Sequence, residues 1–172
     1  GDLRSWLQWK VVHGAAAFLS DDFVAESFAF YGTALSGVPV NRERWKRGVG
    51  LTEAALGEAI GHVYVDRHFP PTSKTAMDTL VANLVEAYRQ SIETLEWMTP
   101  ATRERALEKL AAFTPKIGYP AKWRDYSALE IDPSDLVGNV LRASMFEHDR
   151  NLAKIGQPIE RDEWYMTPQT VN

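Results

Sequence analysis

The sequence contains no cysteine, and this absence removes several classes of function. Disulfide frameworks, thiolate metal sites and a cysteine nucleophile all need a thiol, so this chain can build none of them. The redox compartment stays open, because no thiol is present to report on it.

Long apolar runs are absent as well. No stretch approaches the roughly 20 apolar residues that a membrane-spanning helix needs. The first residues, Gly1-Asp2-Leu3-Arg4, lack the charged and then apolar pattern of a signal peptide. We therefore expect no membrane segment in this chain. The compartment of a longer parent stays open, with an exported or cell-envelope location favoured over a cytoplasmic one.

A basic stripe is also missing. The chain has 19 Lys and Arg against 23 Asp and Glu, a net charge of -4, and the two signs are mixed along it. Surfaces that bind nucleic acid concentrate basic residues on one face. The composition therefore argues against nucleic acid as a partner.

Helical periodicity is what the sequence does contain. Apolar residues recur at three- and four-residue steps, most clearly in the stripe from Met77 to Leu95. Helix start signals stand at Ser20-Asp21-Asp22, Asn41, Thr99-Pro100 and Asp132-Pro133-Ser134-Asp135, and stop signals at Pro70-Pro71 and Gly156-Gln157-Pro158. We predict an all-α (mainly α) helical bundle over residues 1–172 as a single helical region, with short extended segments near residues 116–120 and 167–172.

The motifs of common enzyme classes are not found. A zinc peptidase of the H-E-x-x-H type needs two His four residues apart beside a Glu. None of the four histidines, His13, His62, His68 and His148, stands in that pattern. His62 and His68 are six residues apart, which places them on opposing faces of a helix. No phosphate-binding loop or serine elbow occurs either, so we assign no catalytic residue and no metal ligand to this chain.

Four stretches together nevertheless resemble one family. They are "IGHVYVDRHF" at 60–69, Leu95-Glu96-Trp97-Met98, "RERALEKLAAFTPKIGYP" at 103–120 with Trp123 shortly after, and "DEWYMTPQTVN" at 162–172. In order and spacing they are similar to the neprilysin and endothelin-converting-enzyme family of zinc metalloendopeptidases. The resemblance extends over residues 25–172 and is most specific at 116–120 and 167–172, which helical periodicity does not explain.

The resemblance implies a role for the last residue. In that family the strand ending in Val-Asn continues as Ala-Tyr-Tyr or Ala-Phe-Tyr, and a zinc helix with H-E-x-x-H and a later glutamate ligand follows. Asn172 would then bind the substrate. A carboxamide can pair with a peptide C=O and N–H at once, and a strand can bind an extended peptide through main-chain hydrogen bonds.

The resemblance also implies what the rest of the chain is. It would be a fragment of the N-terminal capping domain, a helical lobe that encloses a cavity for peptide substrates. The missing catalytic lobe of the same chain would supply the zinc, and the fragment alone would hold no cofactor and show no activity. The lack of cysteine suggests a bacterial member. A fragment without its second lobe is expected to expose an apolar patch and to self-associate.

Two alternatives come from other classes of function. In the first, the chain is a non-catalytic helical protein-interaction module whose Met77-to-Leu95 stripe docks a partner helix. In the second, Trp6, Trp9 and Trp45 form a carbohydrate-binding platform, although aromatic residues at helical spacing more often belong to a core.

Overall fold

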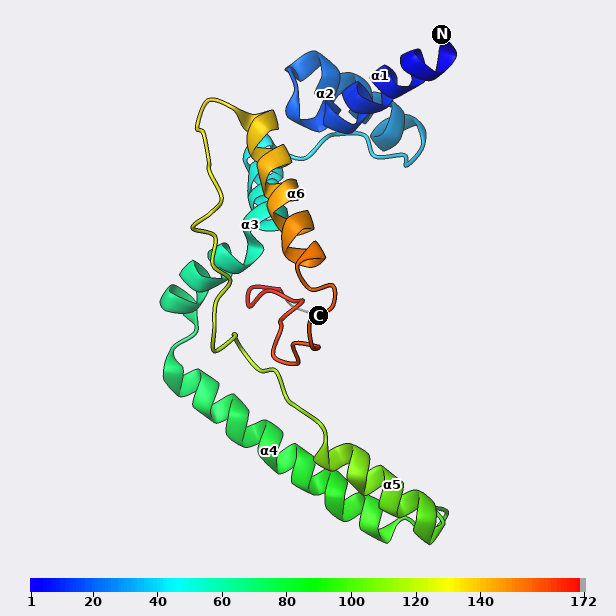
Figure 1. Ribbon diagram of the computed structural model, residues 1–172, viewed down its shortest axis with the longest axis vertical. Coiled ribbons are helices and arrows are strands. Elements are labelled where there is room, and N and C mark those ends of the chain that lie inside the picture. Colours follow the sequence, from blue (N-terminus) through cyan, green and yellow to red (C-terminus); the bar gives the residue numbers. More distant parts are fainter. Residues whose placement is uncertain (171–172) are drawn as a thin grey trace. The chain divides into compact units, whose positions relative to one another are not determined.

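A computed structural model describes residues 1–170, in which the regular structure is helical and no β-strand occurs (Figure 1). The helices are α1 (Asp2–Ala15), α2 (Asp21–Ser27), α3 (Arg44–His68), α4 (Pro71–Thr94), α5 (Pro100–Ala111) and α6 (Leu136–Leu152), with a 3₁₀ turn η1 (Ala16–Phe18) and a π-helical segment η2 (Phe28–Ala34). The prediction of an all-α fold is confirmed.

The starts of α5 and α6 follow from local capping. The hydroxyl of Thr99 accepts a 3.3 Å hydrogen bond from the backbone N–H of Thr102, and Pro100 occupies the first position of α5. The carboxylate of Asp135 accepts a 2.8 Å bond from the N–H of Gly138 at the start of α6. Both starts were predicted from these residue types.

The start of α3 differs from the prediction. This helix begins at Arg44, not after an Asn41 cap. The double proline ends α3 as expected and also begins α4, because Pro70 is extended and Pro71 stands at the first helical position, where the missing N–H costs no hydrogen bond. The helix α4 therefore starts six residues before the apolar stripe at Met77.

The two segments predicted as extended are non-helical, but both contain turns. In residues 116–120 the N–H of Tyr119 donates to the C=O of Ile117 at 3.0 Å, across Gly118, whose φ is 77°. In residues 167–170 the N–H of Thr170 donates to the C=O of Thr167 at 3.0 Å, with Pro168 at the second position. Val171 and Asn172 lie outside the described residues.

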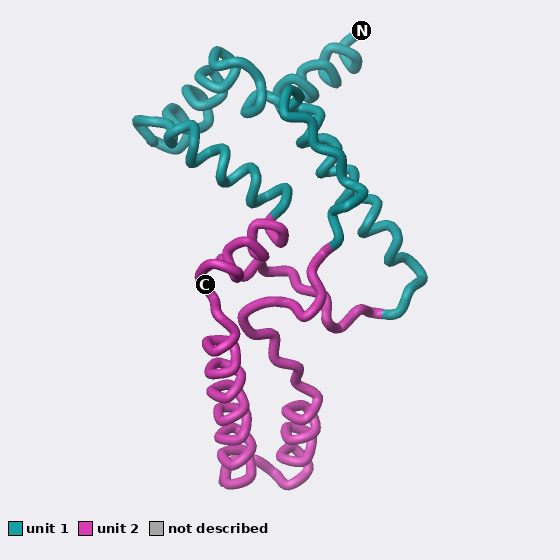
Figure 2. The backbone as a smooth tube through the Cα atoms, turned by 90° about the vertical axis from the view of Figure 1, so that its left-hand side faces the viewer, with its two compact units in different colours: residues 1–56, 125–158 teal, residues 57–124, 159–172 magenta. Residues whose placement is uncertain are grey.

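The contacts group the chain into two compact units (Figure 2). Unit 1 consists of residues 1–56 and 125–158, and unit 2 of residues 57–124 and 159–172. The first boundary falls on a kink inside α3, where Leu56 leaves helical geometry with φ -132° and ψ 32°. In unit 2, α4 and α5 lie side by side as a helical hairpin (Figures 1 and 2). That residues 1–172 belong to one helical region of a larger capping domain stays a prediction.

Very few apolar side chains are buried. Among the described residues the buried hydrophobic ones are Ala16, Val65 and Ala143, whereas the α4 stripe is exposed at Met77, Leu80, Leu84 and Tyr88. A self-sufficient domain of this size removes about two thirds of its unfolded surface from water, and contiguous apolar surface on a free monomer is unusual. The periodicity thus predicted α4 itself but not what covers its apolar face.

None of the helices in residues 1–170 is long and apolar enough to cross a bilayer.

Candidate functional site

The second part of α3, in unit 2, presents two glycines to the C-terminal segment. Gly57, Gly61 and Val65 follow one another at four-residue steps and are buried. A Cβ atom added to Gly57 would lie 2.8 Å from Cγ2 of Thr167, and one added to Gly61 would lie 2.6 Å from Cδ of Pro168. Gly57 and Gly61 therefore form a notch, the glycine notch, into which the turn at residues 167–170 fits.

A side-chain amide fastens this turn in the glycine notch. Nε2 of Gln169 donates a 3.0 Å hydrogen bond to the backbone carbonyl of Gly57. The hydroxyls of Thr167 and Thr170 are 2.7 Å apart and close the turn on itself. The turn is thus held both internally and against α3, two residues before Asn172.

The oxygen of this amide has no hydrogen-bond donor among the described residues. Oε1 of Gln169 is buried and lies 2.9 Å from the position of a Cβ on Gly61. A buried acceptor without a donor costs about 1–3 kcal/mol. Gln169 therefore packs closely against Gly61, and a side-chain atom added to Gly61 would clash with its oxygen.

A row of aromatic rings connects residues 117–123 with α3. The ring of Phe69 meets Tyr119 edge-on at 5.9 Å between centroids, Tyr119 stacks on Trp123 at 6.0 Å, and His62 meets Trp123 edge-on at 4.7 Å. Gly118 makes this approach possible, because a Cβ there would lie 2.8 Å from Cε1 of Phe69. Its positive φ also favours glycine.

Polar contacts join the same segments. Nζ of Lys116 donates to the backbone carbonyl of Glu163, and Nζ of Lys74 donates to the carbonyl of Ile117 at 3.0 Å. The carboxylate of Glu58 on α3 accepts a bond from the N–H of Arg124 and lies 3.6 Å from its guanidinium. The stretches around 116–120 and 163–170, both prominent in the resemblance, are therefore directly linked within unit 2.

Three of the four histidines contact aromatic side chains. His13 bonds the hydroxyl of Tyr31 at 2.8 Å, His62 contacts Trp123, and His68 lies 5.2 Å from Tyr64. In residues 1–170 no group of three or more His, Cys, Asp or Glu side chains is arranged to hold a metal ion. The donor set in residues 1–170 therefore does not fit a catalytic zinc ion.

The one site residue predicted from sequence, Asn172, lies outside the described residues. What the structure describes is the support immediately before it. Sequence reasoning missed Gly57, Gly61 and Gln169, although two glycines four residues apart in the middle of a helix are a signal of close approach by another segment. That signal does not say which segment approaches.

Comparisons with known proteins agree on one family. Residues 1–120 match the family model of peptidase family M13. The neutral endopeptidase of Lactobacillus helveticus is 32% identical over 167 residues, which are 96% of this chain and 26% of that protein. Human neprilysin is 26% identical over 179 residues, covering 99% of this chain and 24% of that protein.

Solved structures agree with this assignment. The zinc metalloprotease Zmp1 of Mycobacterium tuberculosis in its open state matches with a TM-score of 0.91 and 57% identity, over 99% of this chain and 26% of that one. PepO from Lactobacillus rhamnosis HN001 matches with a TM-score of 0.81 and 29% identity, over 90% of this chain and 25% of that one. The chain spans about a quarter of the length of these relatives.

Proposed function

This chain belongs to peptidase family M13, and from that premise we propose that it is the helical capping lobe of a zinc metalloendopeptidase that cleaves peptides. Its match is to the N-terminal region of the family, as the resemblance to neprilysin predicted. The observation that carries the proposal is the fit of residues 167–170 into the glycine notch. The capping lobe thereby fixes the start of the strand that would bind the substrate.

In this proposal Asn172 pairs with the backbone of an extended peptide. Its amide N–H groups donate to a substrate carbonyl and its carbonyl accepts from a substrate N–H. Such pairing helps catalysis only if it holds the scissile bond in a narrow range of positions, since a displacement of about 1 Å can cost about 100-fold in rate. Gln169 and the glycine notch supply the rigid support that this positioning requires.

The metal belongs to another part of the proposed parent. Zinc in such an enzyme activates a water molecule and polarises the substrate carbonyl. Its ligands would lie in polypeptide beyond these 172 residues. The exposed apolar faces of this chain support the same view, because a lobe that completes a cavity with a second lobe needs apolar surface to meet it.

The test is an Asn172→Ala substitution in the full-length parent, assayed with a quenched fluorogenic peptide. We expect kcat/KM to fall by about 10- to 100-fold, the effect of one or two lost hydrogen bonds, with unchanged zinc content and melting temperature. Asn83→Ala is the matched control, because Asn83 is an exposed asparagine on α4, away from the glycine notch. Wild-type kcat/KM in Asn172→Ala would contradict the proposed role.

A second candidate, the helical interaction module, is favoured by one observation. Leu84 and Tyr88 on α4 are 48% and 57% exposed, so the stripe is free to meet a partner helix. Leu84→Lys in the 172-residue chain separates the two accounts. Loss of folding means that the stripe is covered in solution, whereas a folded chain that has lost a one-to-one partner supports the module.

A further inference from the structure

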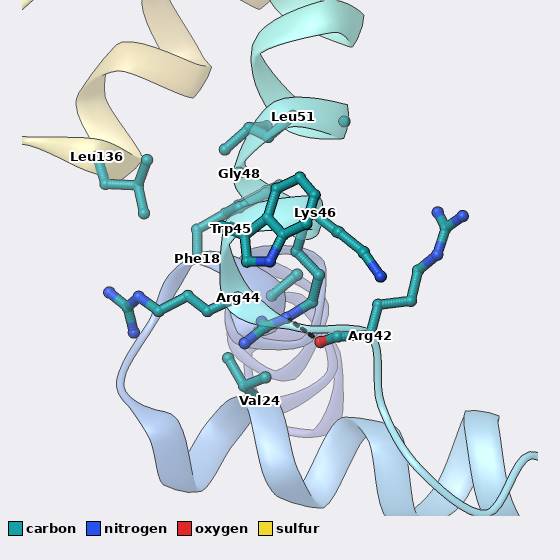
Figure 3. A pocket seen from close by; sticks show the side chains of 12 residues that line it. Phe18, Val24, Arg42, Arg44, Trp45, Lys46, Gly48, Leu51 and Leu136 are labelled. Atoms are coloured by element: carbon teal, nitrogen blue, oxygen red, sulfur yellow. Dashed lines mark hydrogen bonds between the residues drawn. The ribbon is translucent and has the colours of Figure 1, made fainter.

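Unit 1 contains a hollow of about 960 Å³ that the glycine notch does not involve (Figure 3). Four helical elements contribute to it, namely η1, α2, the start of α3 and the first residue of α6, together with Arg42 from the loop before α3. The indole of Trp45 lies in the middle of the hollow, with Leu51 and Leu136 on one side and Val24 on the other (Figure 3). We call it the Trp45 hollow.

The lining of the Trp45 hollow combines an apolar floor with a basic rim. The floor is formed by Phe18, Val24, Leu51 and Leu136 around the indole. The rim carries four cations within six residues of sequence, Arg42, Arg44, Lys46 and Arg47. The net charge of the whole chain is -4, so the positive charge of this rim is a local feature.

Two of these cations have carboxylate partners and two do not. Arg44 lies 3.3 Å from Asp21, and Lys46 lies 3.0 Å from Glu43, both as solvent-exposed pairs of small energetic weight. Arg47 donates through Nε to the backbone carbonyl of Arg42 at 3.2 Å. No carboxylate in residues 1–170 pairs with the guanidinium of Arg42 or Arg47.

We propose that the Trp45 hollow is a docking site for an acidic, amphipathic segment of the same polypeptide that lies outside residues 1–172. Its apolar side chains would cover Trp45 and Leu51, and separate Asp or Glu side chains would pair with Arg42 and with Arg47. Guanidinium and carboxylate groups form paired, charge-assisted hydrogen bonds, so this rim selects for a carboxylate.

Two observations favour such an occupant over a small anionic molecule. Trp45 is 65% exposed in the middle of the hollow, whereas small-molecule sites enclose most of their ligand. The chain also covers about a quarter of its relatives, so a parent of that length has ample further polypeptide to supply the segment. The inference rests on the proposed function only in requiring that longer parent, and it makes no use of Asn172 or of peptidase activity.

The first test is photo-crosslinking in the full-length parent with benzoylphenylalanine in place of Trp45. We expect an intramolecular crosslink to a peptide outside residues 1–172 that contains Asp or Glu, identified by mass spectrometry. The same probe at Trp97, which is 76% exposed in unit 2, is the control and should not reach that peptide. A crosslink confined to residues 1–172, one between two copies, or none at all would overturn the proposal.

The second test reverses the charges on the rim. Arg42→Glu with Arg47→Glu should lower the yield of that crosslink by about 10-fold, as expected for loss of a charge-assisted pair. Changing the crosslinked acidic residue to Lys should restore it. Arg105→Glu, a reversal at an exposed site on α5, should leave the yield unchanged. An unchanged crosslink yield in the Arg42→Glu, Arg47→Glu variant would show that these arginines do not recognise the segment, and would overturn the inference. The proposed function is tested separately, by the effect of Asn172→Ala on kcat/KM.

Discussion

The side-chain amide of Gln169 donates a 3.0 Å hydrogen bond to the backbone carbonyl of Gly57, 112 residues earlier in the chain. This bond joins the turn before Asn172 to the part of α3 that begins at the kink. Side-chain atoms added to α3 at the same place would clash with this turn, at Gly57 with Thr167 and at Gly61 with Pro168. A substitution at Gly57 or Gly61 should therefore change how the C-terminal segment packs against α3.

Gly61→Ala should destabilise the protein. The added Cβ would lie 2.6 Å from Cδ of Pro168, and a proline ring cannot turn aside as a flexible side chain would. We expect a net loss of about 1–2 kcal/mol, because an overpacking cost of about 1–3 kcal/mol exceeds the gain in helix propensity of up to about 1 kcal/mol. Thermal unfolding measures it.

The matched control for that substitution is Gly48→Ala in the same helix, where an added Cβ meets nothing within 4 Å. It should raise stability by about 0.5–1 kcal/mol through helix propensity alone. Equal and positive shifts in melting temperature for both variants would show that the glycine notch is not occupied in solution.

Gln169→Glu should make stability depend on pH. A carboxylate there faces the carbonyl of Gly57 and cannot donate to it, whereas the protonated acid can. The pKa of the new carboxyl should be raised by folding, so its destabilising effect is absent at low pH and appears as pH rises above the ordinary value. Melting temperatures of Gln169→Glu and wild type at pH 4 and pH 7 measure this, and a constant difference between the two proteins would count against the bond.

Glu86 should titrate far below its usual range. Hydrogen bonds from Arg89, and then from Gln90, lower the pKa of Glu86 from 4.5 to about 2. Because folding lowers this pKa, the contribution to stability is present above about pH 4.5 and is lost as pH falls towards 2. Carboxyl chemical shifts give the midpoint, and Arg89→Ala should raise it. A midpoint near 4.5 in the unsubstituted protein would rule out the arrangement around Glu86.

The isolated 172-residue chain should self-associate. Its α4 stripe exposes Leu80, Leu84 and Tyr88, and water is a poor solvent for a continuous apolar face. Sedimentation should show oligomers that grow with protein concentration. A monomer at all concentrations would mean that the stripe is covered within the chain.

Local features of the fold could be read from the sequence, and contacts between distant segments could not. The caps at Thr99 and Asp135 were predictable because each bonds an N–H three residues away. The turn at Thr167-Pro168 was predicted as a strand, since the β-branched residues around it favour extended structure. The Thr167-Pro168 pair is typical of a β-turn, because proline is favoured at the second position of such a turn.

The candidate site was predictable only in part. The family resemblance singled out residues 116–120, and its assignment of Asn172 to the site stays a prediction. The glycine notch depends on the pairing of Gly57 with Gln169 across 112 residues. No periodicity in one segment specifies its partner in another. The kink at Leu56 and the π-helical turn at η2 likewise have no signal of their own in the residue pattern.

The most direct test of the account is a double-mutant cycle in kcat/KM between Gly61→Ala and Asn172→Ala in the full-length parent. If the glycine notch acts by positioning Asn172, Gly61→Ala lowers kcat/KM in the wild-type background and has almost no further effect once Asn172 is alanine. We expect that coupling, with unchanged zinc content in all four proteins. Fully additive effects of the two substitutions would contradict it.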